Sequence, residues 1–316
     1  MLIKRLKSVF QEISQVYMTL LKVMVPAIII VKILDLLGGT QWLAEVLAPL
    51  MQLVGLPEQL GLVWATAILT NIFTAMVVFV DVTTQLELSV AQVSVIGILI
   101  LISHSVPIEG AVAKMVGVSW RLTITLKLGG GLFLAALVNW LYTALDYQQQ
   151  TAVLIWQSER QEQTLMQWGI EQLQMLLSIF FIISALIILL RVLKKIGVEN
   201  LLKKALSPIF KLIGITKDAS NITITGITLG LSYGAGLLIS EVKKGNIGKK
   251  DILLSISFLS LAHSLIEDTL LVLLLGADVM AILWMRVIFA VIIVALLAKY
   301  IAFKESIQLK RLSIDR

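Results

Sequence analysis

Two short segments of the sequence carry the same pattern of side chains that can titrate or bind a polar ligand, a His-Ser pair followed by acidic residues. The two sets are His104, Ser105 and Glu109, and His263, Ser264, Glu267 and Asp268. Both lie within apolar stretches, where an ionisable group is costly and usually marks the path of a substrate or ion. Imidazoles and buried carboxylates can exchange protons near physiological pH. We therefore expect these residues to line a substrate-binding site, with Glu109 and Asp268 as candidates for coupling to an ion.

The same residues do not form the pattern of an enzyme active site. Adjacent helical positions such as His104 and Ser105 point in different directions, so they cannot pair as base and nucleophile. The chain has no Cys, which excludes disulfides, iron–sulfur clusters and thiolate zinc. Gly129–Gly131 lacks the Lys-Ser or Lys-Thr of a phosphate loop and indicates close helix packing instead. The sequence therefore predicts a protein without enzymatic activity or a cofactor.

The composition indicates whether this site lies in a soluble protein or in a membrane protein. Hydrophobic residues make up 58% of the 316 positions and charged residues 15%, with a mean hydropathy of +0.95. These values exclude a soluble globular domain and a disordered chain. Apolar runs of spanning length recur from about residue 16 to residue 301, so we expect a polytopic protein in a lipid bilayer. The net charge of +6 does not indicate nucleic acid, because basic residues in membrane proteins report on topology.

The chain contains an internal repeat with an offset of 159 residues. This offset pairs the site candidates with one another: His104 with His263, Glu109 with Asp268 and Lys127 with Arg286. The chain has only two His residues, and chance would place them in this register roughly once in 300 trials. We therefore divide the chain into two repeats, residues 1–158 and 159–316, which together form one transmembrane domain.

The distribution of basic residues predicts that the two repeats are inverted in the membrane. Residues 38–57 contain no Lys or Arg, whereas the equivalent part of the second half, with its flanks, is rich in lysine. These lysines are Lys194, Lys195, Lys203, Lys204, Lys211 and Lys217. Because Lys and Arg accumulate in cytoplasmic loops, equivalent segments should lie on opposite sides. The basic N-terminus predicts an inner-membrane protein with both termini in the cytoplasm.

Inversion requires an odd number of crossings in each half. We expect about three transmembrane helices, an interfacial helix and a re-entrant hairpin or broken helix per repeat, within an all-α fold. In the first half the expected segments are 16–37, 40–55, 59–81 with a turn near Thr70-Asn71, 89–116 broken at 104–107, and 121–144. In the second half they are 172–191, 199–213, 219–240, 251–275 and 280–301.

Other polar residues fall near the expected hairpin tips and inside the crossings. The tip residues are Asn71 and Thr74 in the first half and Ser232 and Tyr233 in the second. Small and hydroxylated side chains there either pack the tips or contact a substrate. Lys127 and Arg286 either extend to the headgroups or serve as charge partners of the buried carboxylates.

These segments together resemble a known family. Leu69–Gly117, with Asn-x-x-Thr-Ala followed by His-Ser-x-Pro-x-Glu, resembles a nucleoside-recognition or Gate domain. Gly226–Gly276, with His-Ser-Leu-Ile-Glu-Asp, resembles a second copy. Gate domains occur in concentrative nucleoside transporters, in spore-maturation membrane proteins and in the membrane part of ferrous iron transporters. The resemblance thus implies membrane transport, with a nucleoside-like substrate class.

Three functions remain open at this point. Inverted repeats with discontinuous segments and midplane polar groups favour a secondary carrier of a small polar solute, coupled to H+ or Na+ and compatible with a homo-oligomer. The His and carboxylate residues equally suit a divalent-metal carrier, although the metal ligands are unknown. A membrane scaffold or regulator that does not transport would show a closed, dry midplane in which every polar group is paired.

Overall fold

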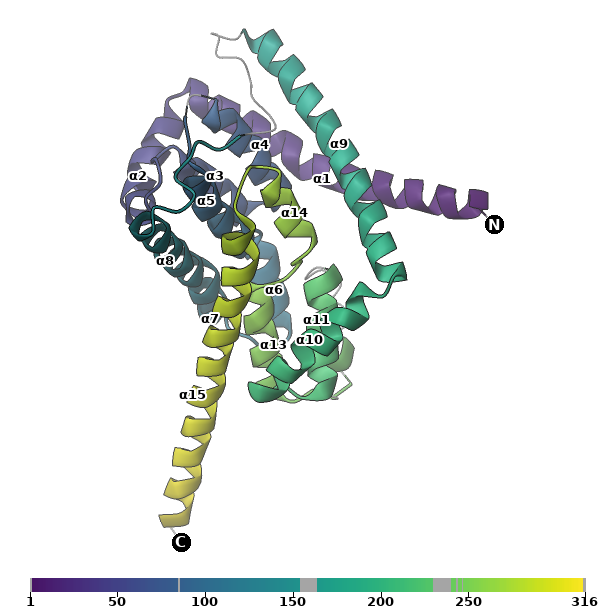
Figure 1. The fold of residues 1–316 in the computed structure, drawn as a ribbon, viewed down its shortest axis with the longest axis vertical. Coiled ribbons are helices and arrows are strands. Elements are labelled where there is room, and N and C mark those ends of the chain that lie inside the picture. Colours follow the sequence, from purple (N-terminus) through teal and green to yellow (C-terminus); the bar gives the residue numbers. More distant parts are fainter. Residues whose placement is uncertain are drawn as a thin grey trace.

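The computed structural model describes residues 2–84, 86–153, 164–229, 240–242, 244–245 and 247–314 (Figure 1). Within these residues the chain is helical, and the β-structure is limited to an isolated bridge between Ser89 and Thr151. Five segments are long and apolar enough to cross a membrane: Val9–Leu36, Val90–Met115, Trp120–Ala144, Leu165–Lys195 and Met280–Lys304. The expected all-α polytopic fold is confirmed.

The first half follows the expected order of segments. Its elements are α1 (Leu2–Leu36), α2 (Gly39–Leu53), α3 (Leu60–Leu69), α4 (Ile72–Thr83), α5 (Val90–Ser103), α6 (Val106–Met115), α7 (Trp120–Ile124), the π-helical turn η1 (Thr125–Gly129) and α8 (Gly130–Ala144). The hairpin α3–α4 turns at Thr70-Asn71, as expected. Helix α1 begins well before residue 16 because residues 4–15 contain neither Pro nor Gly.

The described part of the second half follows a similar order, and residues 230–239, where the second arm of the expected hairpin 219–240 falls, lie outside the described residues. Its elements are α9 (Leu165–Lys195), α10 (Val198–Leu212), α11 (Lys217–Leu229), α13 (Lys249–Leu261), α14 (Glu267–Leu273), η2 (Met280–Met285) and α15 (Arg286–Ile314). Glycines 159 residues apart share the left-handed conformation: φ is 73° at Gly38 and 86° at Gly197, and 91° at Gly117 and 90° at Gly276. The backbone thus follows the sequence repeat, while the inverted orientation stays a prediction.

The expected crossing at 251–275 is not among the five spanning segments, because residues 262–266 separate α13 from α14. Its counterpart α5–α6 is also interrupted, but only at His104-Ser105. The chain therefore contains two discontinuous segments at equivalent places in the repeat.

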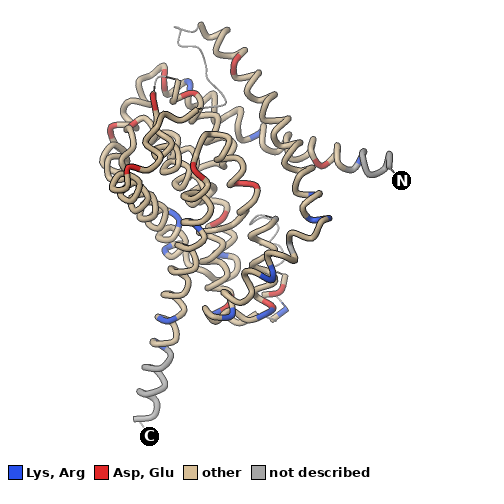
Figure 2. Tube along the Cα trace, in the orientation of Figure 1, with Lys and Arg blue, Asp and Glu red and all other residues tan. Residues whose placement is uncertain are grey.

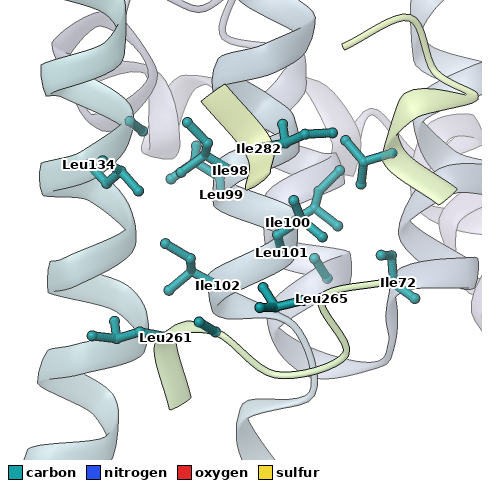
Figure 3. Packing of buried hydrophobic residues seen from close by; sticks show 14 of the residues in the cluster. Ile72, Ile98, Leu99, Ile100, Leu101, Ile102, Leu134, Leu261, Leu265 and Ile282 are labelled. Atoms are coloured by element: carbon teal, nitrogen blue, oxygen red, sulfur yellow. The ribbon is translucent and has the colours of Figure 1, made fainter. Parts of the chain in front are cut away.

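Helix α5 forms the centre of the hydrophobic core. The hydrophobic residues of α5 between Val95 and Ile102 are at most 1% exposed. Figure 3 shows Ile98–Ile102 lying among Leu134 of α8, Ile282 of η2, and Leu261 and Leu265 of the second half. Because both halves pack around α5, the interruptions of α5 and α13 are brought together inside the molecule.

Charged residues are distributed unevenly over the two ends of the molecule. Figure 2 shows acidic residues around the loops of α2, α3 and α4, and both basic and acidic residues at the end formed by α10 and α11. Helix α10 contains three Lys and one Glu, whereas its equivalent α2 contains Glu45 and no basic residue, which is the contrast that the positive-inside rule associates with inverted repeats.

Candidate functional site at the two helix breaks

Each interruption places a serine in an unusual backbone conformation. Ser105 has φ of 54° and Ser264 has φ of 45°, in the left-handed region that residues other than glycine rarely adopt. The first break is anchored to the hairpin, because the Ser105 amide donates to the carbonyl of Ala67 at 2.9 Å and its hydroxyl to that of Thr70 at 2.8 Å. The second is anchored similarly, since the Leu265 amide donates to the carbonyl of Ile227 at 3.0 Å. The hairpin arms α3 and α11 therefore fix the position of the breaks.

The two histidines meet between the halves. The Nε2 atoms of His104 and His263 lie 3.1 Å apart, and the rings are buried. The Nδ1 atoms lie 3.0 Å from the carbonyl oxygen of Ile100 and 2.8 Å from that of Leu259, respectively. A carbonyl only accepts hydrogen bonds, so we assign the ring hydrogen to Nδ1 in both residues. In the neutral rings, each Nε2 then presents a lone pair to the other.

Two carboxylates face the same pair of nitrogens. Glu109 Oε1 lies 3.3 Å from His263 Nε2 and 3.7 Å from His104 Nε2, while Asp268 Oδ2 lies 3.8 Å from both. The four residues are between 3% and 7% exposed, so solvent scarcely reaches them. The site therefore gathers acceptor atoms from both halves in a nearly dry environment.

Lys127 and Arg286 occupy equivalent positions but make different contacts. Lys127, in η1, donates to Glu109 Oε2 at 2.5 Å. Arg286, which follows η2, donates only to backbone oxygens among the described residues. These are the carbonyls of Leu261 at 2.9 Å, His263 at 2.9 Å and Leu101 at 3.3 Å. Helix ends leave such carbonyls without intrahelical partners, so Arg286 caps both interrupted helices while Lys127 neutralises one carboxylate.

The hairpin residues do not join this cluster. Asn71 Oδ1 accepts hydrogen bonds from the amide of Thr74 at 3.0 Å and from its hydroxyl at 3.2 Å, so Asn71 caps the start of α4 and Thr74 supplies the donors. Glu267 is half-buried, and no hydrogen bond or ion pair joins it to the histidines in the described part of the chain. Ser264 is buried beside His263. Ser232 and Tyr233 lie outside the described residues.

Replacing Asn71 by Ala is expected to lower the free energy of unfolding by about 1 kcal/mol, because the first turn of α4 loses its side-chain cap. The measurement is thermal unfolding of the full chain in detergent. Asn71→Asp keeps the accepting oxygen and should stay close to the wild type. Equal losses in the two variants would contradict a capping role.

One contributor to the site escaped the sequence analysis. Ser103, the last residue of α5, donates its hydroxyl to the carbonyl of Lys127 at 2.9 Å. A π-helical turn disturbs the regular hydrogen-bond ladder, and this hydroxyl satisfies a carbonyl within that turn. The close approach is possible because Gly131 faces Ser103: a Cβ atom at Gly131 would lie 2.9 Å from the Ser103 Oγ. The Gly129–Gly131 run was a signal for this packing.

These features define an all-α polytopic membrane protein whose two discontinuous helices meet at a buried charged cluster. Residues 17–119, which include α2 to α6 and thus His104 and Glu109, match the family model for Gate, described as nucleoside recognition. This match confirms the expected resemblance to a Gate domain for the first half, while the resemblance of Gly226–Gly276 to a second copy stays a prediction.

The chain is also similar to an uncharacterized membrane protein, YvoD, of Bacillus subtilis (strain 168). The two are 27% identical over 287 residues, which cover 89% of each chain. No solved structure matches the chain. The Gate match and this relative support a membrane protein of a transporter-like kind.

Proposed function

We propose that this protein is a secondary carrier of a small polar solute, with its binding site between two inverted repeats, residues 1–158 and 159–316. One observation carries the proposal: the interrupted helices of the two halves meet with His104 and His263 only 3.1 Å apart at Nε2. Interrupted helices persist in a membrane only inside protein or beside a wet cavity. Carriers built from repeats use such helices to form their substrate sites.

In this proposal the cluster is the solute site in a closed state. The binding groups are the side chains at the two breaks and at the hairpin tips: His104, Ser105, Glu109, His263, Ser264, Asp268 and Glu267 at the breaks, and Asn71, Thr74, Ser232 and Tyr233 at the tips. A nucleoside-like solute follows from the Gate description. The protein would lie in the inner membrane with both termini in the cytoplasm, as the basic N-terminus favours.

The polar groups of the cluster favour a ligand site over a scaffold. A scaffold was expected to show a closed midplane with every polar group paired. The cluster is buried, but Asp268 Oδ2 and Arg286 Nη1 have no hydrogen-bond partner in the described part of the protein. Such groups are costly unless a ligand or ion completes them.

The proposed coupling group is Glu109, whose Oε1 faces both imidazoles while Oε2 is held by Lys127. In proteoliposomes, the wild type is expected to accumulate one class among nucleosides, amino acids and organic acids against a gradient. Glu109→Gln should abolish accumulation driven by a proton gradient while solute exchange persists, because a neutral amide cannot release a proton. Loss of exchange as well would assign Glu109 to solute binding instead.

Glu45→Gln is the matched control, because Glu45 is an exposed acid on α2. It should transport like the wild type. The carrier function would be contradicted if the wild type neither accumulates nor exchanges any of these solutes and none of them raises its melting temperature. A bound ligand at one hundred times its Kd stabilises the native state by about 2.7 kcal/mol, which such a melting experiment readily detects.

A further inference from the structure

We infer that His104, His263 and Asp268 form a binding site for one divalent transition-metal ion between the two halves. One ligand atom from each residue, Nε2, Nε2 and an oxygen of Asp268, lies within 4.8 Å of the others. All three side chains are buried. The inference rests on the cluster assigned to the proposed carrier, but binding of the ion at equilibrium does not require transport.

The orientation of both imidazoles is that of metal ligands. Each Nδ1 is fixed by the backbone carbonyl four residues earlier in its own helix, at 3.0 Å for His104 and 2.8 Å for His263. Metal-binding histidines typically donate their other ring N–H to a carbonyl or carboxylate, which fixes the tautomer and the ring plane. Here the same device directs two lone pairs at each other across 3.1 Å. Two such lone pairs repel unless a positive centre lies between them.

The spacing of the ligand atoms fits a small ion without large movement. Zinc-type ions bind nitrogen and oxygen at about 2.0–2.1 Å, and tetrahedral geometry then separates neighbouring ligand atoms by about 3.3 Å. The observed separations are 3.1 Å between the two Nε2 atoms and 3.8 Å from Asp268 Oδ2 to each of them. Shifts of a few tenths of an ångström would bring the three atoms to coordination distance.

Asp268 is the carboxylate that lacks a partner. Its Oδ2 is buried and accepts no hydrogen bond from the described residues, and it faces both histidines. Glu109, in contrast, is bound to Lys127 through Oε2, although its Oε1 borders the site at 3.3 Å from His263. A cation between the histidines would satisfy Asp268, and Glu109 would lie beside the remaining coordination position.

Some of the surrounding charges favour a cation at this site, and others oppose one. Helices α5 and α13 end at the site, where the C-terminal end of a helix dipole favours a cation, whereas α6 and α14 begin there and their N-terminal ends oppose one. Lys127 and Arg286 oppose one, but Glu109 neutralises Lys127, and Nε and Nη2 of Arg286 donate to carbonyl oxygens. Two imidazoles with one carboxylate suit Zn2+, Co2+, Ni2+ or Mn2+, whereas Ca2+ and Mg2+ prefer oxygen ligands.

The test is a Co2+ titration of the full chain in detergent after treatment with a chelator, followed by visible absorption, with Zn2+ added afterwards to displace Co2+. The wild type should bind one ion per chain with the absorption bands of low-coordinate Co2+, and Zn2+ should abolish them. Asp268→Asn should weaken binding by about 100-fold or more through loss of a charged ligand. Glu45→Gln, which changes an exposed acid on α2 outside the cluster, should bind like the wild type.

Absence of Co2+ bands and of Zn2+ binding in the wild type would overturn the metal site. The close contact of the two Nε2 atoms would then be explained by a proton shared between the histidines. Equal affinities in Asp268→Asn and the wild type would also overturn it. If Asp268→Asn does not fold, His104→Gln and His263→Gln make the same test, because each removes one nitrogen ligand. Metal binding without any transport would contradict only the carrier, whereas transport without metal binding would contradict only the metal site.

Discussion

Lys127→Met is expected to lower the free energy of unfolding by about 3–5 kcal/mol, because it leaves the Glu109 carboxylate buried without its cation. Lys127 is fully buried and contacts Glu109 at 2.5 Å, so no water is available to replace the ammonium group. Met has a similar length and keeps the packing of the aliphatic stem. The measurement is unfolding of the purified chain in detergent, by melting and by chemical denaturation.

The double variant Lys127→Met/Glu109→Gln tests whether the loss of stability in Lys127→Met comes from the unpaired charge of Glu109 or from lost packing of Lys127. Removing both charges is expected to recover most of the lost stability, because a buried ion pair stabilises little relative to neutral groups of similar size. Lys114→Met, which removes an exposed lysine from α6, should change stability by less than about 0.5 kcal/mol. A double variant as unstable as Lys127→Met would show that Lys127 acts through packing.

The hairpin and the first break could be predicted because their signals are local. The Thr70-Asn71 turn interrupts an apolar run, and Pro107 obstructs the turn before it. The structure separates α3 from α4 and α5 from α6 at these positions. The second break has no proline, and the repeat offset alone placed it at His263. An internal duplication therefore carried information that local propensity lacked.

The capping role of Asn71 was not predicted, although the sequence contained a signal for it. Asn is among the preferred residues at a helix N-cap, and Asn71 directly precedes an apolar run. The sequence analysis left packing and substrate contact open for Asn71 and Thr74, and the structure shows the local hydrogen bonds. Their contact with a solute remains a proposal.

The partners of Lys127 and Arg286 could not be derived from the sequence. Equivalent positions in a repeat predict equivalent partners, yet one cation meets a carboxylate and the other meets carbonyls. The difference depends on which carbonyl groups the breaks leave free and on how the halves pack. The π-helical turns before Gly130 and Arg286 were likewise not predicted, because a π turn depends on tertiary contacts such as that of Ser103.

Arg286→Met is expected to lower the free energy of unfolding by about 3–5 kcal/mol as well, for a different reason. Arg286 is fully buried, and its guanidinium donates to Leu261 and His263 in the second half and to Leu101 in the first. Its loss leaves buried carbonyls unsatisfied at both helix breaks, and each unsatisfied group costs about 1–3 kcal/mol. Lys299→Met, on the exposed face of the same helix, is the control and should change little.

Arg286→Lys decides whether charge or geometry matters. An ammonium group keeps the positive charge but lacks the planar fork that reaches several acceptors at once, so we expect an intermediate loss of stability. Stability equal to the wild type would show that charge alone suffices and would contradict the capping role. A loss as large as that of Arg286→Met would assign the whole effect to the guanidinium geometry. Because its acceptors belong to both halves, such a loss would also make Arg286 the residue that holds the two breaks in register and positions His104 against His263.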